Sequence, residues 1–294
     1  MTAAFRDKHQ LPESFARIET EFYEPLGRWV EQRLSERKGS EPLILGINGA
    51  QGTGKSTLAD FIREFLAVVH DRRTVVLSID DLYLPRAERQ ALAKDVHPLL
   101  ATRGVPGTHD VELGLSVIRS LQRLEQGQSQ LVPRFDKSTD DRCAELEWTR
   151  VCGPVDVIIF EGWCVGSQPA TDDELLNAIN DLEADEDPNR IWRAYVNQQL
   201  KEIYPPLFEM LDVLVFMSAP DFECVLRWRT EQEEKLALSA SESKTHVMTK
   251  SQIERFIQHY ERITKQNLAS IATKADVRLE LGRDHRVVSA HYTT

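Results

Sequence analysis

The sequence predicts an α/β protein built on a parallel β-sheet. Short apolar runs alternate along the chain with amphipathic helical stretches, an order typical of parallel strands joined by helical crossovers. Three of the runs, VVLSI, VDVIIF and LDVLVFM, are almost continuously hydrophobic, as expected for strands covered on both faces. The predicted strands are residues 43–47, 74–79, 155–160, 211–217 and 277–281.

Helical periodicity divides the rest of the chain. Residues 14–37 carry apolar side chains at helical spacing, and we expect Pro25 to kink or split that helix. We therefore expect residues 1–40 to form an N-terminal helical extension and residues 41–294 to form the main domain. A later helix contains Ile253, Phe256, Ile257, Tyr260 and Ile263, and Ser251 with Glu254 could form its capping box.

Two polar segments interrupt this pattern. The segment 167–188 is rich in acidic residues, and we expect it to form an exposed helix–loop excursion. Residues 236–248 (LALSASESKTHVM) are expected to form a mobile loop.

Composition limits the possible functions. The 294 residues are 41% hydrophobic and 28% charged, which is typical of a globular protein. No apolar stretch is long enough to span a membrane, and the N-terminus does not resemble a signal peptide. The net charge of −11 argues against nucleic acid as a partner. The four cysteines fit no zinc spacing, so we expect unpaired, buried thiols and a cytoplasmic location.

The strongest motif follows the first predicted strand. GAQGTGKS satisfies the Walker A pattern G-x-x-x-x-G-K-[ST] and lies between a strand and a helix. Such a loop turns its backbone N–H groups toward phosphates, while the lysine neutralises phosphate oxygens and the serine contacts Mg²⁺. The alternative is a glycine-rich turn without a ligand, which the full match disfavours. The predicted nucleotide-binding residues are Gly49, Gln51, Gly52, Thr53, Gly54, Lys55, Ser56 and Thr57.

Acidic residues follow two of the other strands. Asp80 and Asp81 come after VVLSI, and Glu161 comes after VDVIIF. Ligands of an open parallel sheet collect beyond the carboxyl ends of its strands, so these carboxylates could hold Mg²⁺ or accept a proton. The alternative is that they cap a following helix or turn. Asp80 and Asp81 should point in opposite directions if the chain is extended there.

Three further stretches combine basic, polar and glycine residues, and here the sequence resembles a known family. They are HPLLATRGVPGTHD (97–110), LVPRFDKSTDDR (131–142) and LRWRTEQE (226–233). Together with GINGAQGTGKST, SIDDLYL, IIFEGW and ERFIQHYERI, they resemble the D-glycerate 3-kinase-like family of P-loop kinases. That family is related to uridine kinase, phosphoribulokinase and pantothenate kinase. The matching stretches extend from residue 46 to about residue 265, most of the chain.

The resemblance implies a doubly wound parallel sheet of the nucleoside-kinase type that uses ATP and Mg²⁺ to phosphorylate a small hydroxyl compound, D-glycerate first. It also implies a lid segment at residues 220–248. Asp80 matches the general base, and Glu161 matches an acid near Mg²⁺ that acts with Ser56. Arg229 matches a lid arginine that acts with Lys55 on the transferred phosphoryl group. The residues implied on the acceptor side, together with Asp80, are Arg103, His109, Arg134 and Lys137.

Alternatives remain for several of these residues and for the function. Arg134 and Lys137 could form surface ion pairs, and His109 could bond a loop backbone. Arg227 and Arg229 lie two residues apart on an expected helix, so they cannot both face one site. The acceptor could be a nucleoside, pantothenate or another sugar acid instead of glycerate, because the acidic segment 170–188 departs from the family pattern. A non-catalytic ATP-binding switch would keep the Walker loop without needing a base.

Overall fold

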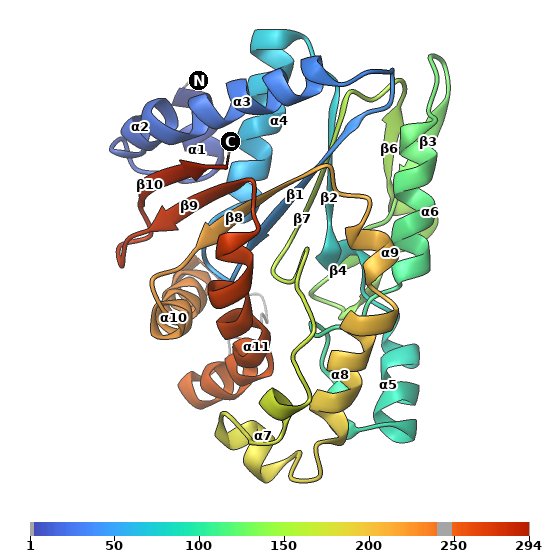
Figure 1. Cartoon of the computed structure of the whole chain (residues 1–294), viewed down its shortest axis with the longest axis vertical. Helices are drawn as coiled ribbons and strands as arrows, with labels where there is room; N and C mark the ends of the chain where they lie inside the picture. Colours follow the sequence, from blue (N-terminus) through green and yellow to red (C-terminus); the bar gives the residue numbers. More distant parts are fainter. Residues whose placement is uncertain (1–2, 240–248, 294) are drawn as a thin grey trace.

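The computed structural model describes residues 3–239 and 249–293, which form a six-stranded sheet between two layers of helices (Figure 1). The strand order is β10-β9-β8-β1-β7-β2. All neighbours pair in parallel except β10, which pairs antiparallel with β9. The strands are β1 (Leu43–Gly49), β2 (Thr74–Ser78), β7 (Val157–Gly162), β8 (Val213–Ser218), β9 (Val277–Leu281) and β10 (Val287–Tyr292). The parallel α/β fold is confirmed.

One helical layer packs against one face of the sheet, and a second layer covers the other face (Figure 1). The first contains α1 (Ala3–Lys8), α2 (Phe15–Ile18), η1 (Glu19–Tyr23), α3 (Glu24–Glu36), α4 (Lys55–His70) and α10 (Phe222–Ser239). The second contains α6 (Val111–Gln122), α8 (Ile191–Glu202), α9 (Pro205–Phe208) and α11 (Lys250–Ser270). No helix in these described ranges is both long and apolar enough to cross a membrane.

Shorter elements surround the carboxyl edge of the sheet and its periphery. The short helices are η2 (Ile79–Leu82), α5 (Arg86–Asp95), η3 (Pro98–Ala101), η4 (Glu145–Glu147), η5 (Asp173–Leu175), α7 (Asp181–Asp185) and η6 (Ile271–Thr273). Two small antiparallel pairs join β3 (Ser129–Val132) to β6 (Thr149–Cys152), and β4 (Phe135–Asp136) to β5 (Asp141–Arg142). The sequence pattern did not reveal these pairs or β10, because each is short or only half buried.

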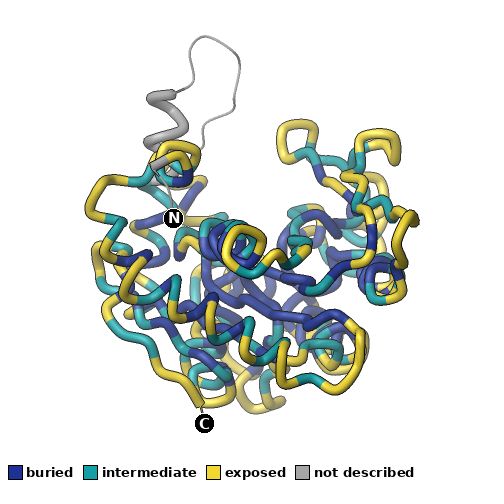
Figure 2. Tube along the Cα trace, turned by 90° about the horizontal axis from the view of Figure 1, so that it is seen from above, coloured by how far each residue is buried: buried dark blue, intermediate teal, exposed yellow. Residues whose placement is uncertain are grey.

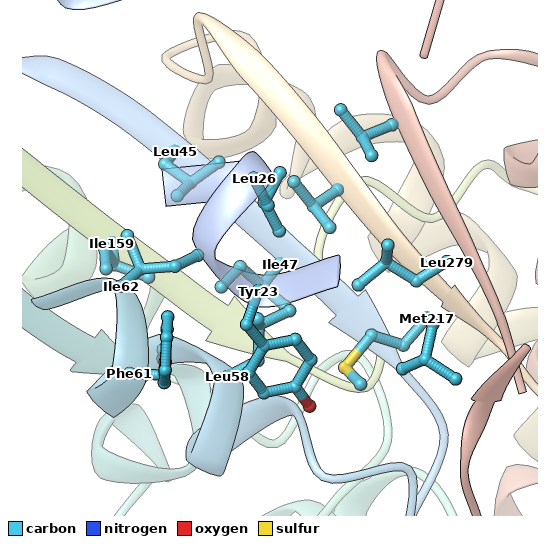
Figure 3. Packing of buried hydrophobic residues seen from close by; sticks show 14 of the residues in the cluster. Tyr23, Leu26, Leu45, Ile47, Leu58, Phe61, Ile62, Ile159, Met217 and Leu279 are labelled. Atoms are coloured by element: carbon cyan, nitrogen blue, oxygen red, sulfur yellow. The ribbon is translucent and has the colours of Figure 1, made fainter. Parts of the chain in front are cut away.

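Strand residues alternate between two hydrophobic cores. In β1, Leu45 and Ile47 pack with α3 and α4 (Figure 3), whereas Ile44 packs with the opposite layer. In β7, Ile159 packs in the same core as Leu45 and Ile47, and Phe160 packs in the same core as Ile44. Both faces are therefore covered, which explains why these strands are continuously apolar. Figure 2 shows the buried strands running through the middle of the molecule, with exposed segments around them.

The N-terminal helices share the first core. The rings of Phe5 and Tyr23 meet the ring of Phe61 in α4 edge to face, with centroids 5.5 and 5.2 Å apart. Pro25 lies in the first turn of α3, directly after the π-helical turn η1; the helical run is continuous from Phe15 to Glu36 and is not split, and only its hydrogen-bond pattern changes before Pro25. The division into an extension of residues 1–40 and a kinase domain of residues 41–294 stays a prediction.

Several local expectations need correction. β2 is the edge strand, so Thr74, Val75 and Val76 are only half buried. Cys164 and Cys224 are buried as expected, but Cys152 is exposed and Cys143 is partly exposed.

The capping box of α11 is formed by a different pair from the one expected. It consists of Thr249 and Gln252, whose side-chain oxygens accept from each other's backbone N–H groups. Helix α10 continues to Ser239, so part of the expected loop is helical, and residues 240–248 lie outside the described residues.

The acidic segment is more firmly attached than its composition suggests. Glu183 and Asp187 are each only 1% exposed. Arg262 donates to Glu183 from Nε at 2.8 Å, and Arg193 pairs with Asp187 at 2.9 Å. Because these buried carboxylates are paired with arginines, the segment is anchored on α8 and α11 and does not form a wholly exposed excursion.

A close contact between α3 and α4 supports a stability prediction. A Cβ atom on Gly27 would lie 2.4 Å from Cδ1 of Phe65. Gly27→Ala gains about 1 kcal/mol of helix propensity but overpacks the interface at a cost of about 1–3 kcal/mol, so we expect net destabilisation. Urea unfolding measures the change, with Gln32→Ala on the exposed face of α3 as the control. A more stable Gly27→Ala protein would contradict the tight packing.

Candidate active site

The Walker loop joins β1 to α4 in a conformation that favours glycine. Gly52 and Gly54 have φ angles of +82° and +87°, and α4 begins at Lys55 immediately after them. A Cβ atom on Gly52 would lie 2.8 Å from Cβ of Trp228. The loop therefore presents backbone N–H groups and a helix N-terminus in the arrangement that binds phosphates.

Two of the predicted nucleotide-binding residues, Gly49 and Thr53, support the conformation of the loop and do not line the cavity. The Thr53 hydroxyl donates to the Ala50 carbonyl at 2.9 Å, and its side chain is buried. A Cβ atom on Gly49 would lie 2.5 Å from Oγ1 of Thr53, so this position accommodates only glycine without rearrangement. Gly49 and Thr53 brace the loop, while Gln51, Gly52 and Gly54 to Thr57 line the adjacent cavity.

Ser56 and Glu161 form an oxygen pair suited to a hard cation. The Ser56 hydroxyl donates to Oε1 of Glu161 at 3.0 Å, and the buried Oε2 of Glu161 has no hydrogen-bond partner in the described part of the chain. Burial raises the pKa of Glu161, Lys55 opposes that shift, and the negative charge of Asp80 adds to it. A desolvated carboxylate with an unsatisfied oxygen is stabilised by a cation, so these residues fit Mg²⁺.

Asp80 stands on η2, directly after β2, and is surrounded by cations. Lys137 donates to Oδ2 at 2.6 Å, and the Tyr83 hydroxyl donates to Oδ1 at 2.7 Å. Burial would raise the pKa of Asp80, but the charges of Lys137 and Lys55 and these hydrogen bonds outweigh it and lower the pKa to about 2. Asp80 is therefore ionised at neutral pH and is a weak base in this state.

Asp81 has different hydrogen-bond partners from Asp80, and its pKa is shifted in the opposite direction. Its Oδ1 accepts from the Phe135 backbone N–H and its Oδ2 from Arg134, both at 3.1 Å. Burial raises the pKa of Asp81, and Arg134 partly counters this. Asp80 and Asp81 diverge as expected, but on a 3-10 turn and not on an extended strand, and Asp81 anchors β4 instead of capping the turn at Leu82 and Tyr83.

A cavity of about 570 Å³ joins these groups and is large enough for a nucleotide and a small acceptor. Its polar and charged lining residues are His9, Gln51, Lys55, Ser56, Thr57, Ser78, Asp80, Arg103, Lys137, Glu161, Arg229, Glu231 and His285. Its aromatic lining residues are Tyr83, Trp163, Trp228, Phe256 and Tyr260.

Three of the predicted cations reach this cavity in addition to Lys55. Lys137 and Arg103 come from the loops after β4 and η3, and Arg229 comes from α10. The Arg229 guanidinium lies 5.5 Å from the centroid of the Phe256 ring. Arg227 donates to the Arg283 carbonyl and lies outside the cavity lining, so the two arginines diverge as the helical spacing predicts.

The structure does not bring Arg134 and His109 to this cavity. Arg134 pairs with Asp81 and lines a separate cavity beside the edge strand β2. His109 is buried behind Tyr83, with the two ring centroids 4.8 Å apart, and its Nδ1 lies 2.6 Å from the Tyr204 hydroxyl. Burial lowers the pKa of His109 to about 4, so it is neutral at physiological pH. These positions do not support acceptor contacts by either residue.

Some residues of the site were not predicted. Tyr83 and Trp163 lie in stretches that carried the family resemblance, so they could have been proposed from those motifs. Trp228 and His285 stack with centroids 4.4 Å apart, and His285 Nδ1 lies 3.2 Å from the Gly52 carbonyl. His9, from the segment after α1, also lines the cavity, and no sequence pattern indicated that.

The sheet order, the Walker loop after β1, Asp80 after β2 and Glu161 near the end of β7 together are typical of the P-loop kinase class. No family model matches the chain. A chloroplastic D-glycerate 3-kinase of Arabidopsis thaliana is 32% identical over 227 residues, which are 72% of this chain but only 47% of the plant protein. The chain thus spans about half the length of that relative.

Two further relatives match over most of their length. The "Uncharacterized kinase mug58" of Schizosaccharomyces pombe is 35% identical over 74% of this chain and 78% of its own. The solved structure of a D-glycerate 3-kinase from Cryptococcus neoformans superimposes with a TM-score of 0.76 at 26% identity, covering 92% of this chain and 99% of that one. This chain belongs to the D-glycerate 3-kinase-like family of P-loop kinases.

The cations around Asp80 make its titration testable without an activity assay. Lys137→Met removes the cation that is paired with Asp80, so we expect the pKa of Asp80 to rise from about 2 toward or above its usual value. NMR titration of aspartate side-chain carbons measures this, with Asp80→Asn assigning the resonance. Lys94→Met on the exposed side of α5 is the control. An unchanged Asp80 pKa in Lys137→Met would mean that the ion pair is absent in solution.

Proposed function

We propose that this chain transfers the γ-phosphoryl group of ATP to a hydroxyl of a small anionic acceptor, with D-glycerate as the first candidate. The observation that carries the proposal is Asp80, which lies between the Walker lysine and Lys137 at the end of the cavity that also contains Arg103. The names of the plant and Cryptococcus relatives support glycerate as the acceptor.

The triphosphate would lie along the Walker loop. Lys55 and the N–H groups of the loop would neutralise and orient its phosphate oxygens. Ser56 and Glu161 would hold Mg²⁺, which when bound neutralises charge on the β- and γ-phosphates. Within residues 3–239 and 249–293, no three His, Cys, Asp or Glu side chains are grouped so that they could hold a metal ion, so phosphates and water would supply the remaining ligands.

Asp80 would take the proton of the attacking hydroxyl. With a pKa of about 2 it cannot hold that proton easily while it remains paired with Lys137. An acceptor carboxylate that attracts Lys137 would weaken this pair and raise the pKa of Asp80, making it a better base. In this way binding of an anionic acceptor and activation of the base are coupled through one lysine.

Arg229 on α10 would close the site, and residues 240–248 of the expected lid segment 220–248 lie outside the described residues. Arg229 comes from α10, which follows β8 and approaches the cavity from the nucleotide side. A guanidinium that reaches the transferred phosphoryl group stabilises its charge, and closure excludes water that would otherwise hydrolyse ATP.

The rival functions are less well supported by this arrangement. A non-catalytic switch needs the Walker loop but no carboxylate at the acceptor end. A nucleoside or pantothenate acceptor would use the aromatic lining, yet the polar atoms of Trp163 and Tyr260 are already bonded to the carbonyls of Gly104 and Arg103. A cytoplasmic location stays a prediction, and we assign no oligomeric state.

An acceptor screen tests the proposed reaction. ATP consumption is measured with D-glycerate, other sugar acids, nucleosides and pantothenate, and we expect turnover with D-glycerate. Lys55→Ala should abolish this turnover and weaken ATP binding without lowering the melting temperature, because Lys55 faces the cavity. Near-normal turnover by Lys55→Ala would remove the phosphate-site assignment, and turnover with nucleosides alone would replace the acceptor class.

The two adjacent aspartates should have separable effects. Asp80→Asn preserves shape but cannot take the proton, so we expect kcat to fall about 10²- to 10⁴-fold, together with a loss of stability because the ion pair with Lys137 is removed. Asp81→Asn should leave kcat within about threefold but cost about 1–3 kcal/mol of stability, because it weakens the bonds to Arg134 and Phe135. Steady-state kinetics and urea unfolding decide between them, and a larger kcat loss in Asp81→Asn would reverse the assignment.

A further inference from the structure

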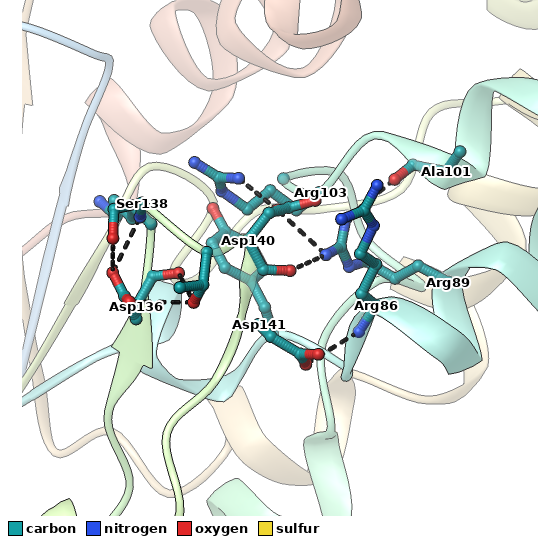
Figure 4. A network of polar contacts seen from close by, with 12 residues as sticks. Arg86, Arg89, Ala101, Arg103, Asp136, Ser138, Asp140 and Asp141 are labelled. Carbon is teal, nitrogen blue, oxygen red and sulfur yellow. Dashed lines mark hydrogen bonds and ion pairs between the residues drawn. The ribbon is translucent and has the colours of Figure 1, made fainter. Parts of the chain in front are cut away.

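Two arginines share one carboxylate at the acceptor end of the cavity (Figure 4). Asp140, in the turn between β4 and β5, forms an ion pair with Arg103 and another with Arg89, whose Nη2 lies 3.0 Å from Oδ1. The Arg89 side chain is 1% exposed, whereas that of Arg103 is 28% exposed and lines the cavity. One cation is therefore structural, and the other is available to a ligand.

Arg89 fixes the position of Asp140. Its guanidinium donates to the backbone carbonyls of Leu84 at 3.1 Å, Ala101 at 2.8 Å and Asp140 at 2.7 Å. Carbonyls satisfy its hydrogen bonds but not its net charge, and a buried cation without a counterion is costly. Asp140 supplies that counterion, so its carboxylate stays beside Arg89 whether or not Arg103 is paired with it.

The backbone of Arg103 is also held in place. The Tyr260 hydroxyl donates to the Arg103 carbonyl at 3.1 Å, and the Trp163 indole N–H donates to the Gly104 carbonyl at 2.9 Å. Gly104 has φ +134°, and a Cβ atom there would lie 2.1 Å from the Tyr260 hydroxyl oxygen. The Arg103 guanidinium also lies 5.6 Å from the centroid of the Phe135 ring. Arg103 thus has a fixed base, and Asp140 restrains the charged end of its side chain.

Arg89, Arg103 and Asp140 together carry a net charge of one positive, which lies on the cavity side. Arg89 and Arg103 contribute two positive charges and Asp140 contributes one negative charge. A guanidinium has five N–H donors, and the ion pair between Arg103 and Asp140 uses Nη1. Arg103 therefore still has N–H groups to donate, and a positive charge that can attract a carboxylate in the cavity.

We propose that Asp140 is a positioning residue which, anchored by buried Arg89, orients Arg103 toward the carboxylate of the acceptor and so makes the site selective for hydroxy acids. This inference rests on the proposed function. The opposite possibility is that Asp140 competes with the acceptor for Arg103 and must be displaced. The anchor on Arg89 favours positioning, because displacement would separate Asp140 from a buried cation.

Asp140→Asn tests the inference in the full-length protein. The amide can still accept a hydrogen bond from Arg89 but carries no charge to orient Arg103. At saturating ATP we expect the KM for D-glycerate to rise about 5- to 20-fold with kcat within about twofold and the KM for ATP unchanged. This is less than the about 10- to 150-fold expected for loss of the whole guanidinium contact in Arg103→Ala. Asp140→Glu, which keeps the charge, should lie closer to the wild type than Asp140→Asn.

The matched control is Asp141→Asn at the next position. Asp141 accepts from the Arg86 backbone N–H at 3.0 Å, whereas the ion pair of Arg103 is with Asp140, so the KM for D-glycerate should not change. Selectivity gives a second readout. The ratio of kcat/KM for D-glycerate to that for the neutral analogue glycerol should fall in Asp140→Asn and stay constant in Asp141→Asn.

A double-mutant cycle separates positioning from a general structural effect. In an Arg103→Ala background, Asp140→Asn should have almost no further effect on the KM for D-glycerate, because both changes remove one interaction. A lower KM in Asp140→Asn would show competition, and an equal rise in both backgrounds would show a structural role; either result overturns the inference. If Asp140→Asn is active and its KM for D-glycerate is unchanged, the positioning role of Asp140 is wrong but the proposed function stands. If the wild-type protein phosphorylates no hydroxy acid, the proposed function is wrong as well.

Discussion

The site depends on the position of β1 between β7 and β8 in a parallel sheet. Parallel neighbours end at the same edge, so the Walker loop after β1 meets the residues after β7 and β2. The registers pair Asn48 with Gly162 and Ser78 with Glu161. Because adjacent strands are about 4.8 Å apart, Ser56, Glu161 and Asp80 are confined to one small volume.

This confinement brings the negative charges of Asp80 and Glu161 close together, and the surroundings of the two carboxylates differ. Asp80 and Glu161 repel each other near the first turn of α4. Asp80 has Lys137 and Lys55 beside it, and its pKa falls to about 2. Glu161 is more deeply enclosed, its pKa is raised, and one of its oxygens has no partner. The charge of Asp80 is thus balanced by the lysines of the protein itself, whereas Glu161 keeps an oxygen that a metal ion could bind.

The protein balances the charges of the acceptor end with its own side chains. Lys137 pairs with Asp80, and Arg103 pairs with Asp140. The short turn between β4 and β5 carries both Lys137 and Asp140, and Asp81 holds its first strand through the Phe135 N–H. A single hairpin therefore connects Asp80, Arg103 and η2, the turn that carries Asp80 and Asp81. An anionic ligand could form new ion pairs with Lys137 and Arg103, which are already balanced by Asp80 and Asp140 in its absence.

The sequence by itself determined the parallel strands, the Walker loop, Asp80 directly after β2 and Glu161 at the carboxyl end of β7. Each depends on local patterns: apolar runs, glycines with positive φ, and acids at strand ends. The tertiary structure decided which cations accompany them. Arg134 and Lys137 are three residues apart in one motif, yet Arg134 turns to Asp81 and only Lys137 reaches Asp80. Arg89, Arg103 and Asp140 come together from three segments, and His285 reaches the Walker loop across the whole chain. Such contacts are set by how loops pack on the finished sheet, and no spacing within the sequence encodes that packing.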